Sequence, residues 1–242
     1  MKIAIVSDIH SNLEAVEAVQ RTIDGIGVDE IYFVGDVVGY GPDPNACTRW
    51  VMENADLAVM GNHDIAALGK IDIESFNPNA KKAIVWNSAH LEDWAIDFIT
   101  TLPMVMSHNG VTIVHANPQE PESWNYIFSL WDAERNFSHF ESTFCFVGHS
   151  HQPVTVERGE SGQVSVLPGD SFTVADGARY LVNVGSVGQP RDGNPEACFG
   201  LLDTDKGEFS ILRSPYEFKI TQEKMLSAGL PKPLADRLAE GR

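Results

Sequence analysis

Acidic, amide and imidazole side chains follow short apolar segments at several places in this chain. Residues 31–34 are Ile-Tyr-Phe-Val, and they lead through Gly35 to Asp36. Such β-branched and aromatic runs are typical of buried strands, although a lone Gly-Asp after a strand is more often a turn than a site. A functional role for Asp36 is favoured because metal-binding or proton-transferring side chains follow several such segments. These residues are Asp8, His10, Asp36, Asn62, His63, His115, His149 and His151.

These residue types suit a transition metal. Imidazole, carboxylate and amide donors without a thiolate favour Mn²⁺, Fe, Zn²⁺ or Ni²⁺ over Ca²⁺ or a structural zinc. The set exceeds the needs of one ion, so it predicts two divalent ions roughly 3.5 to 4 Å apart, a spacing that clamps both oxygens of a phosphoryl displacement. A carboxylate can bridge two ions through its two oxygens, and a hydroxide between two cations is deprotonated near neutral pH. The predicted nucleophile is therefore a metal-bridging hydroxide.

Alternating strand-like and helix-like segments would bring these residues together. Strands are predicted over residues 2–7, 31–34, 55–60, 110–114, 143–147 and 179–184. Ser11 and Glu14 form a capping-box pattern before a first helix, Asp43 is the expected N-cap of a second helix that begins at Pro44, and residues 80–101 predict a third. This order predicts an α/β fold with parallel βαβ units, in which ligands gather at the carboxyl ends of the strands.

The second half of the chain is richer in β-structure. A hairpin is predicted over residues 154–167 and a strand pair over residues 197–212. Residues 215–242 predict two short amphipathic helices broken at Gly229-Leu230-Pro231, and nothing in them suggests chemistry. We therefore expect one catalytic domain over residues 1–214 and a C-terminal helical extension over residues 215–242. The turn-rich residues 65–79 could overhang the site.

Composition restricts the partners and the compartment. The formal charge of −17, from 34 acidic and 17 basic residues, argues against non-specific nucleic-acid binding, so an anionic substrate would need bound cations. The sequence shows neither a leader pattern nor a bilayer-spanning apolar run, so we expect a cytoplasmic protein with no membrane partner. Cys47, Cys145 and Cys198 lie far apart without a C-x-x-C pair, which disfavours disulfides and a thiolate zinc site. No oligomeric state is favoured.

Five blocks of sequence resemble, in order, the five motif blocks of the calcineurin-like metallophosphoesterases: Asp8-Ile9-His10, Gly35-Asp36-Val37-Val38-Gly39, Gly61-Asn62-His63-Asp64, His115 and Gly148-His149-Ser150-His151. The resemblance implies a four-layer α/β/β/α sandwich with two mixed β-sheets. It also implies two metal ligand sets that share Asp36. One set would be Asp8, His10, Asp36 and His151, and the other would be Asp36, Asn62, His115 and His149.

The resemblance also implies roles beside the metal ligands. His63 matches the family's histidine that steadies the substrate phosphate or protonates the leaving group, and Asp64 would orient it and hold its pKa near neutrality. Arg191 resembles a phosphate contact of small bacterial members, although Pro-Arg-Asp-Gly is as often a surface turn. Three further histidines follow no strand end and are expected outside the site: His90, His108 and His139.

One departure from the family pattern bears on the substrate. Protein phosphatases of this superfamily, and the symmetric diadenosine tetraphosphate hydrolases, usually place an arginine just after the second block, where this chain has Gly39-Tyr40-Gly41. The missing guanidinium favours a phosphodiester or a nucleotide. Candidate base-stacking side chains are Tyr40, Trp124, Tyr126 and Phe128, each of which alone is more often a packed loop residue. Two alternatives stay open: a protein phosphatase, and an interaction scaffold that keeps the fold without catalysis.

Overall fold

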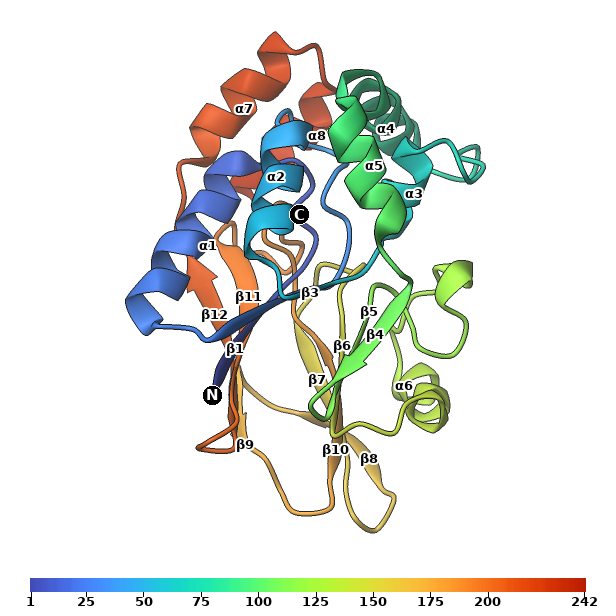
Figure 1. Ribbon diagram of the computed structural model, residues 1–242, viewed down its shortest axis with the longest axis vertical. Coiled ribbons are helices and arrows are strands. Elements are labelled where there is room, and N and C mark those ends of the chain that lie inside the picture. The colour runs from blue at the N-terminus through green and yellow to red at the C-terminus, as the bar shows by residue number, and fades with distance from the viewer.

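A computed structural model describes residues 1–242 and contains two six-stranded β-sheets (Figure 1). The first sheet consists, in spatial order, of β3 (Leu57–Ala58), β2 (Glu30–Phe33), β1 (Lys2–Val6), β11 (Ala197–Asp203), β12 (Glu208–Ser214) and β9 (Ser171–Thr173). The second consists of β4 (Val105–His108), β5 (Val111–Val114), β6 (Phe144–Val147), β10 (Arg179–Asn183), β7 (Val154–Arg158) and β8 (Val164–Leu167).

Both sheets are mixed. In the first sheet β1 is parallel to β2 and antiparallel to β11, and in the second sheet β5, β6 and β10 are parallel neighbours. Parallel neighbours need crossover connections, which α1 (Leu13–Ile26) and α2 (Pro44–Asn54) provide in the first sheet. The candidate ligands follow the carboxyl ends of β1, β2, β5 and β6, except for Asn62, which follows β3.

Alternate residues of β1 belong to different cores, and this alternation defines the layers. Ala4 and Val6 pack in a cluster formed with α1, α2 and α5 (Asp93–Thr101), whereas Ile3 and Ile5 pack between the two sheets. A further cluster joins the outer face of the second sheet to α6 (Leu130–Asn136). This order of helices, sheet, sheet and helix confirms the predicted four-layer sandwich.

A separate apolar cluster joins the C-terminal helices to the rest of the chain. It is formed by α4 (Pro78–His90), α7 (Phe218–Ser227) and α8 (Lys232–Asp236), which lie together in Figure 1. Met225 and Leu234 are buried there with Tyr40, and each such side chain contributes roughly 1.5 to 3 kcal/mol of burial free energy. Lys224 of α7 also donates to Asp43 at 2.8 Å, which ties α7 to the start of α2.

The helix predicted over residues 80–101 is two helices, α4 and α5. The chain is extended at Leu91 and Glu92 between them. Asn45 accepts from the Glu92 N–H at 2.9 Å and donates to the His90 carbonyl at 2.8 Å, so it satisfies backbone groups at the break. Asn45 lies far from this break in the sequence, so the spacing of apolar residues alone predicted a continuous helix.

One of the two predicted helix starts differs from the one observed. Ser11 and Glu14 form no capping box, because Ser11 has a φ of 57° and Asn12 is the N-cap of α1. Asp43 is the N-cap of α2, as predicted, although its carboxylate makes no capping hydrogen bond and binds Lys224 instead.

Several short elements were not predicted. The strand expected over residues 55–60 is reduced to β3, and β4 and β9 are short edge strands with exposed residues and no clear alternation. The other unpredicted elements are α6, α3 (Asn62–Ala67), η1 (Pro121–Ser123), η2 (Phe137–His139) and η3 (Arg237–Ala239).

All three cysteines are buried free thiols. Among the helices, none combines the length and the apolar character that crossing a bilayer requires.

Candidate metal centre

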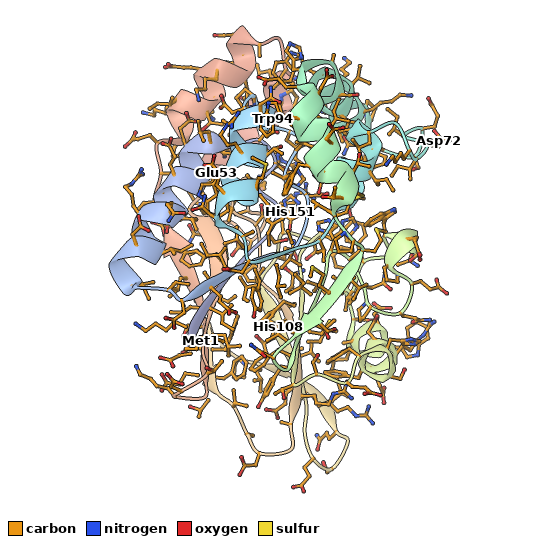
Figure 2. All side chains as sticks on the ribbon, in the orientation of Figure 1. Met1, Glu53, Asp72, Trp94, His108 and His151 are labelled. Carbon is orange, nitrogen blue, oxygen red and sulfur yellow. The ribbon has the colours of Figure 1, made fainter.

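Loops at the carboxyl ends of four strands meet at the start of α3 and bring the eight candidate side chains together. None of the eight is more than 7 % exposed. Figure 2 labels His151 at this place, whereas His108 lies farther along the sheet. His90, His108 and His139 are exposed and make no contact with the cluster.

The backbone is left-handed at most of these positions. Asp8, His10, Asp36, His149 and His151 have φ between 49° and 66°. This conformation costs a residue with a side chain roughly 1 to 3 kcal/mol, so surrounding contacts must hold it in place. The strain concentrates where the ligand side chains must turn inward.

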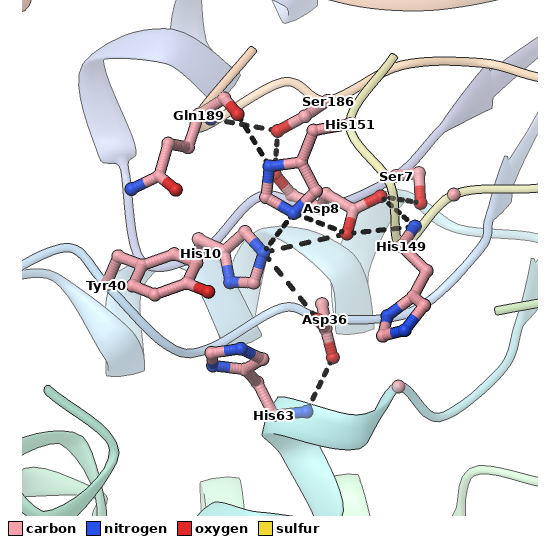
Figure 3. Close-up of polar contacts among 12 residues, drawn as sticks. Ser7, Asp8, His10, Asp36, Tyr40, His63, His149, His151, Ser186 and Gln189 are labelled. Carbon is pink, nitrogen blue, oxygen red and sulfur yellow. Dashed lines mark hydrogen bonds and ion pairs between the residues drawn. The ribbon is translucent and has the colours of Figure 1, made fainter. Parts of the chain in front are cut away.

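His10 and His151 face each other through their Nε2 atoms (Figure 3). His10 Nδ1 lies 3.1 Å from the Val38 carbonyl and His151 Nδ1 lies 2.6 Å from the Gln189 carbonyl, and a carbonyl can only accept. Each Nδ1 therefore carries the proton, and the two Nε2 atoms, 3.0 Å apart, present lone pairs to each other. Asp8 Oδ1 lies 3.2 Å from His151 Nε2. Three atoms with lone pairs thus face one point, and no proton lies between them. Such an arrangement can bind a cation.

A second group of donors lies on the other side of Asp36. His115 Nδ1 is held by the Val34 carbonyl at 2.8 Å, which directs its Nε2 to Asp36 Oδ2 at 3.2 Å and to Asn62 Oδ1 at 3.2 Å. His149 completes the group, and its Nε2 donates to a backbone carbonyl at 2.9 Å, leaving Nδ1 as its lone-pair donor. This donor set also fits a divalent transition metal.

The two carboxylates are positioned by hydrogen bonds on their outer oxygens. Asp8 Oδ2 accepts from Ser7 Oγ at 2.6 Å and from the His149 N–H at 3.0 Å. Asp36 Oδ1 accepts from the His63 N–H at 2.8 Å, while Oδ2 lies 3.6 Å from His10 Nε2 and faces His115 on its other side. The two clusters therefore share a single Asp36 oxygen, whereas the sequence interpretation assumed a bridge through both.

Asp64 does not orient His63 as the resemblance implied. Its Oδ2 accepts from the N–H groups of Asp36 and Gly61, at 2.9 Å each, and its Oδ1 accepts from the Val38 N–H at 3.1 Å. The carboxylate thus fixes the loop that carries Asp36. The reason is local, because Asp64 is the third residue of α3 and its carboxylate accepts the N–H of Gly61, the N-cap of that helix.

His63 has no carboxylate partner. Its Nδ1 is buried and makes no hydrogen bond, and its ring lies 4.8 Å from His10 and 4.6 Å from Tyr40. Burial holds the pKa of His63 well below its usual value. The expectation of a pKa near neutrality is therefore wrong for the protein without bound metal or substrate. An orphaned buried nitrogen beside the donor clusters leaves room for an external acceptor.

The electrostatics of the centre favour cations. Burial disfavours charge on His115, yet Asp36 and Asp8 outweigh it and raise its pKa to about 10. Burial lowers the pKa of His149 to about 4 and that of His151 to about 3. Burial alone would raise the pKa of the two carboxylates, but the neighbouring histidines hold both below the usual range. Asp8 and Asp36 thus favour a positive charge beside them, and in the metal-free protein they favour the protonated form of His115.

Supporting residues of the centre were not predicted from the sequence. Asn87 of α4 is fully buried, accepts from Ser11 Oγ at 2.6 Å and donates to the Gly41 carbonyl at 3.2 Å. Ser186 accepts from the Gln189 N–H at 2.8 Å. A single Asn within a helix or Ser within a loop carries no recognisable pattern, and only the three-dimensional contacts reveal these roles.

Tyr40 and Arg191 lie together at the edge of the centre. Arg191 Nη2 donates to the Tyr40 hydroxyl at 3.1 Å, and the Tyr40 ring lies 4.5 Å from His10. An arginine from another loop thus contacts the residue that follows the second block.

Loop aromatics extend outward from His149. Tyr126 stacks on the His149 ring at 4.1 Å, and Phe128, 69 % exposed, stacks on Tyr126 at 4.8 Å. The Trp124 ring lies edge-on to His115 at 6.2 Å. Tyr126 also borders a cavity of about 270 Å³ whose lining is almost entirely polar.

The fold and this centre agree with comparisons with known proteins. The model of the calcineurin-like phosphoesterase superfamily domain matches residues 1–207, and the chain belongs to this family. It is accordingly a phosphoester hydrolase.

Three similar proteins span most of the chain. The crystal structure of a metallophosphoesterase from Sphaerobacter thermophilus has a TM-score of 0.88 at 38% identity and covers 100% of this chain and 99% of its own. Protein MJ0912 of Methanocaldococcus jannaschii is 38% identical over 245 residues, which are 99% of this chain and 98% of that protein. Phosphodiesterase YfcE of Escherichia coli K12 is 25% identical over 211 residues, 85% of this chain and 89% of that protein.

Proposed function

We propose that this chain is a binuclear metal-dependent phosphoesterase that hydrolyses a phosphodiester or a nucleotide in the cytoplasm. The observation that supports two ions is the sharing of Asp36 Oδ2 by two buried donor clusters. The free thiols suit a reducing compartment. One ion would be held by Asp8, His10, Asp36 and His151, and the other by Asp36, Asn62, His115 and His149.

Bound divalent ions supply a hydroxide nucleophile at neutral pH and neutralise the charge of the phosphoryl oxygens. The chain itself supplies the geometry. Asp64 and Asn87 hold the loops that carry the ligands, and the carbonyl partners of His10, His115 and His151 fix each ring with its Nε2 turned inward.

His63 is the proposed phosphate contact and proton donor. Its buried Nδ1 lacks an acceptor, which a substrate oxygen beside it would provide. The negative charge of that oxygen would also raise the low pKa of His63 toward the range that a general acid needs.

A nucleotide or nucleoside phosphodiester is the proposed substrate class. The stack of His149, Tyr126 and Phe128 leads from the centre to solvent, and a base can stack on its exposed outer face. The adjoining polar cavity offers hydrogen-bonding groups for a base or a sugar.

The test is hydrolysis of bis-p-nitrophenyl phosphate by metal-free protein supplemented with Mn²⁺, Fe²⁺, Zn²⁺ or Ni²⁺, together with metal analysis. We expect two ions per chain and a metal-dependent rate. A rate no higher than that of metal solutions without protein would favour the scaffold alternative. Because Arg191 contacts Tyr40, which follows the second block, a phosphoserine peptide belongs in the same assay. Faster hydrolysis of the peptide than of any diester or nucleotide would favour the protein phosphatase.

A further inference from the structure

Two arginines meet beside the metal centre on one uncharged acceptor. Arg191 donates to Gln189 Oε1 from Nη2 at 2.9 Å and from Nε at 3.3 Å, and Arg237 Nη1 donates to the same oxygen at 3.3 Å. Two like charges thus converge on a neutral amide. Gln189 Nε2 is buried without a hydrogen-bond partner, so the two arginines determine the orientation of the amide.

No acidic side chain balances these two charges. Neither guanidinium has a carboxylate oxygen within 4.0 Å, although the chain has 34 acidic residues and pairs Arg213 with Asp192 elsewhere. Both arginines are partly buried. Burial and the charge of Arg191 lower the pKa of Arg237, as expected for a cation whose neighbours do not compensate it.

The pair adjoins the proposed reaction site. The Arg191 guanidinium lies 5.5 Å from the centre of the Tyr40 ring, and that ring lies 4.6 Å from His63. Arg237 reaches the same Gln189 oxygen from the short η3 segment that follows α8. An anion held by both arginines would therefore lie next to the hydrolysed phosphate.

We propose that Arg191 and Arg237 bind a second phosphate group of the substrate, one that is not hydrolysed. This inference rests on the proposed function and narrows its substrate to esters with at least two phosphate groups. A guanidinium binds phosphate through two parallel hydrogen bonds, and two guanidiniums supply a local positive field in a chain of charge −17. Arg237 lies beyond the residues 1–207 that match the family, so residues 215–242 gain a role in substrate choice.

A purely structural role makes a different prediction. The Gln189 carbonyl accepts from His151 Nδ1 at 2.6 Å. In a purely structural role, the two arginines would hold Gln189 in place and, through it, the metal ligand His151. Loss of Arg237 would then lower metal content and impair all substrates equally.

The first experiment compares two p-nitrophenyl esters of thymidine 5′-phosphate, with and without a 3′-phosphate. They share a leaving group and differ only in the second phosphate. We expect the holoenzyme to prefer the ester with the 3′-phosphate in kcat/KM, and Arg237→Gln to reduce this preference by roughly tenfold, mainly through KM. Arg242→Gln, which removes the same charge from the same segment at an exposed position, should keep the preference. Absence of a preference in the unmodified protein, or equal losses on both esters, would overturn the proposal.

The second experiment needs no catalysis. The melting temperature of the metal-free protein is measured against inorganic phosphate, with chloride at equal ionic strength as the control. Phosphate should raise the melting temperature, less in Arg237→Gln than in Arg242→Gln. This readout remains valid if the protein hydrolyses nothing, so failure of the subsite and failure of the proposed function are distinguishable. Equal stabilisation of both variants would refute the site, and phosphate binding without any effect on the ester preference would refute its substrate role.

Discussion

Asp64 binds the backbone of Asp36 rather than the ring of His63, and its Oδ2 accepts from the Asp36 N–H at 2.9 Å. The same carboxylate accepts two further N–H groups, from Val38 and Gly61. All of these groups are buried, so the carboxylate determines where the shared ligand of the two clusters stands.

Asp64→Asn should therefore destabilise the protein and loosen the centre. Asparagine keeps one acceptor oxygen and turns amide hydrogens toward the remaining donor, which leaves a buried N–H unpaired at a cost of about 1 to 3 kcal/mol. Denaturant unfolding of the metal-free protein and metal analysis measure both effects. Asp132→Asn is the control, because Asp132 also accepts backbone N–H groups but lies in the first turn of α6, outside the two donor clusters. Normal stability with two bound ions would contradict the role of Asp64.

Asp36→Asn should abolish activity and lower the metal content below two ions. The shared position needs an anionic oxygen that faces both clusters, and an amide oxygen is a weak bridge. Asp8→Asn should impair chiefly one ion, since Asp8 Oδ1 faces the His10 and His151 side. Two metals per chain with near-normal turnover in Asp36→Asn would show that the clusters do not depend on this bridge.

His63→Ala should retain both ions and lose kcat by roughly 10²- to 10⁴-fold, the usual contribution of a general acid. The loss should be smallest for a nitrophenyl leaving group and largest for an alkyl or ribose one, because a donor matters in proportion to the basicity it neutralises. Rates for a series of leaving groups, together with metal analysis, test this. Loss of an ion would place His63 in the coordination shell, and equal losses for good and poor leaving groups would leave it only a positioning role.

Metal binding should release protons and strengthen as the pH rises. The raised pKa of His115, about 10 in the metal-free protein, means that this ring is protonated at pH 7 and must lose its proton to bind an ion. The apparent affinity should rise by up to about tenfold per pH unit for each proton displaced. Calorimetric titration with Mn²⁺ in two buffers of different ionisation enthalpy counts these protons. A binding enthalpy independent of the buffer would contradict the prediction.

Much of the centre could be predicted because metal-ligating residue types follow the apolar segments that are predicted as strands. Asp36 and His115 follow buried strands of the two different sheets, β2 and β5, whose burial is visible in their composition. The parallel pairs β1–β2 and β5–β6 place the ligand-bearing strand ends at one edge of each sheet. The two-sheet architecture came from the family resemblance, and alternate burial along β1 confirms it.

The contacts that hold the ligands could not be predicted. Asn87 and Gln189 act through partners far away in sequence, and the left-handed backbone at Asp8 or His149 is not the usual conformation of these residue types. The role expected for Asp64 was wrong for the same reason, since its nearest donors are backbone groups that no sequence pattern identifies.

The pairing of β1 with β11 has a consequence for how the molecule folds during synthesis. Lys2 stands opposite Asp203 in the sheet, so the second neighbour of the first strand emerges from the ribosome about two hundred residues later. Until then β1 has only β2 beside it, and an unpaired edge of apolar residues invites association with other chains. Nascent chains halted before β11 should accordingly bind chaperones, and the first sheet should close only after translation has passed residue 203.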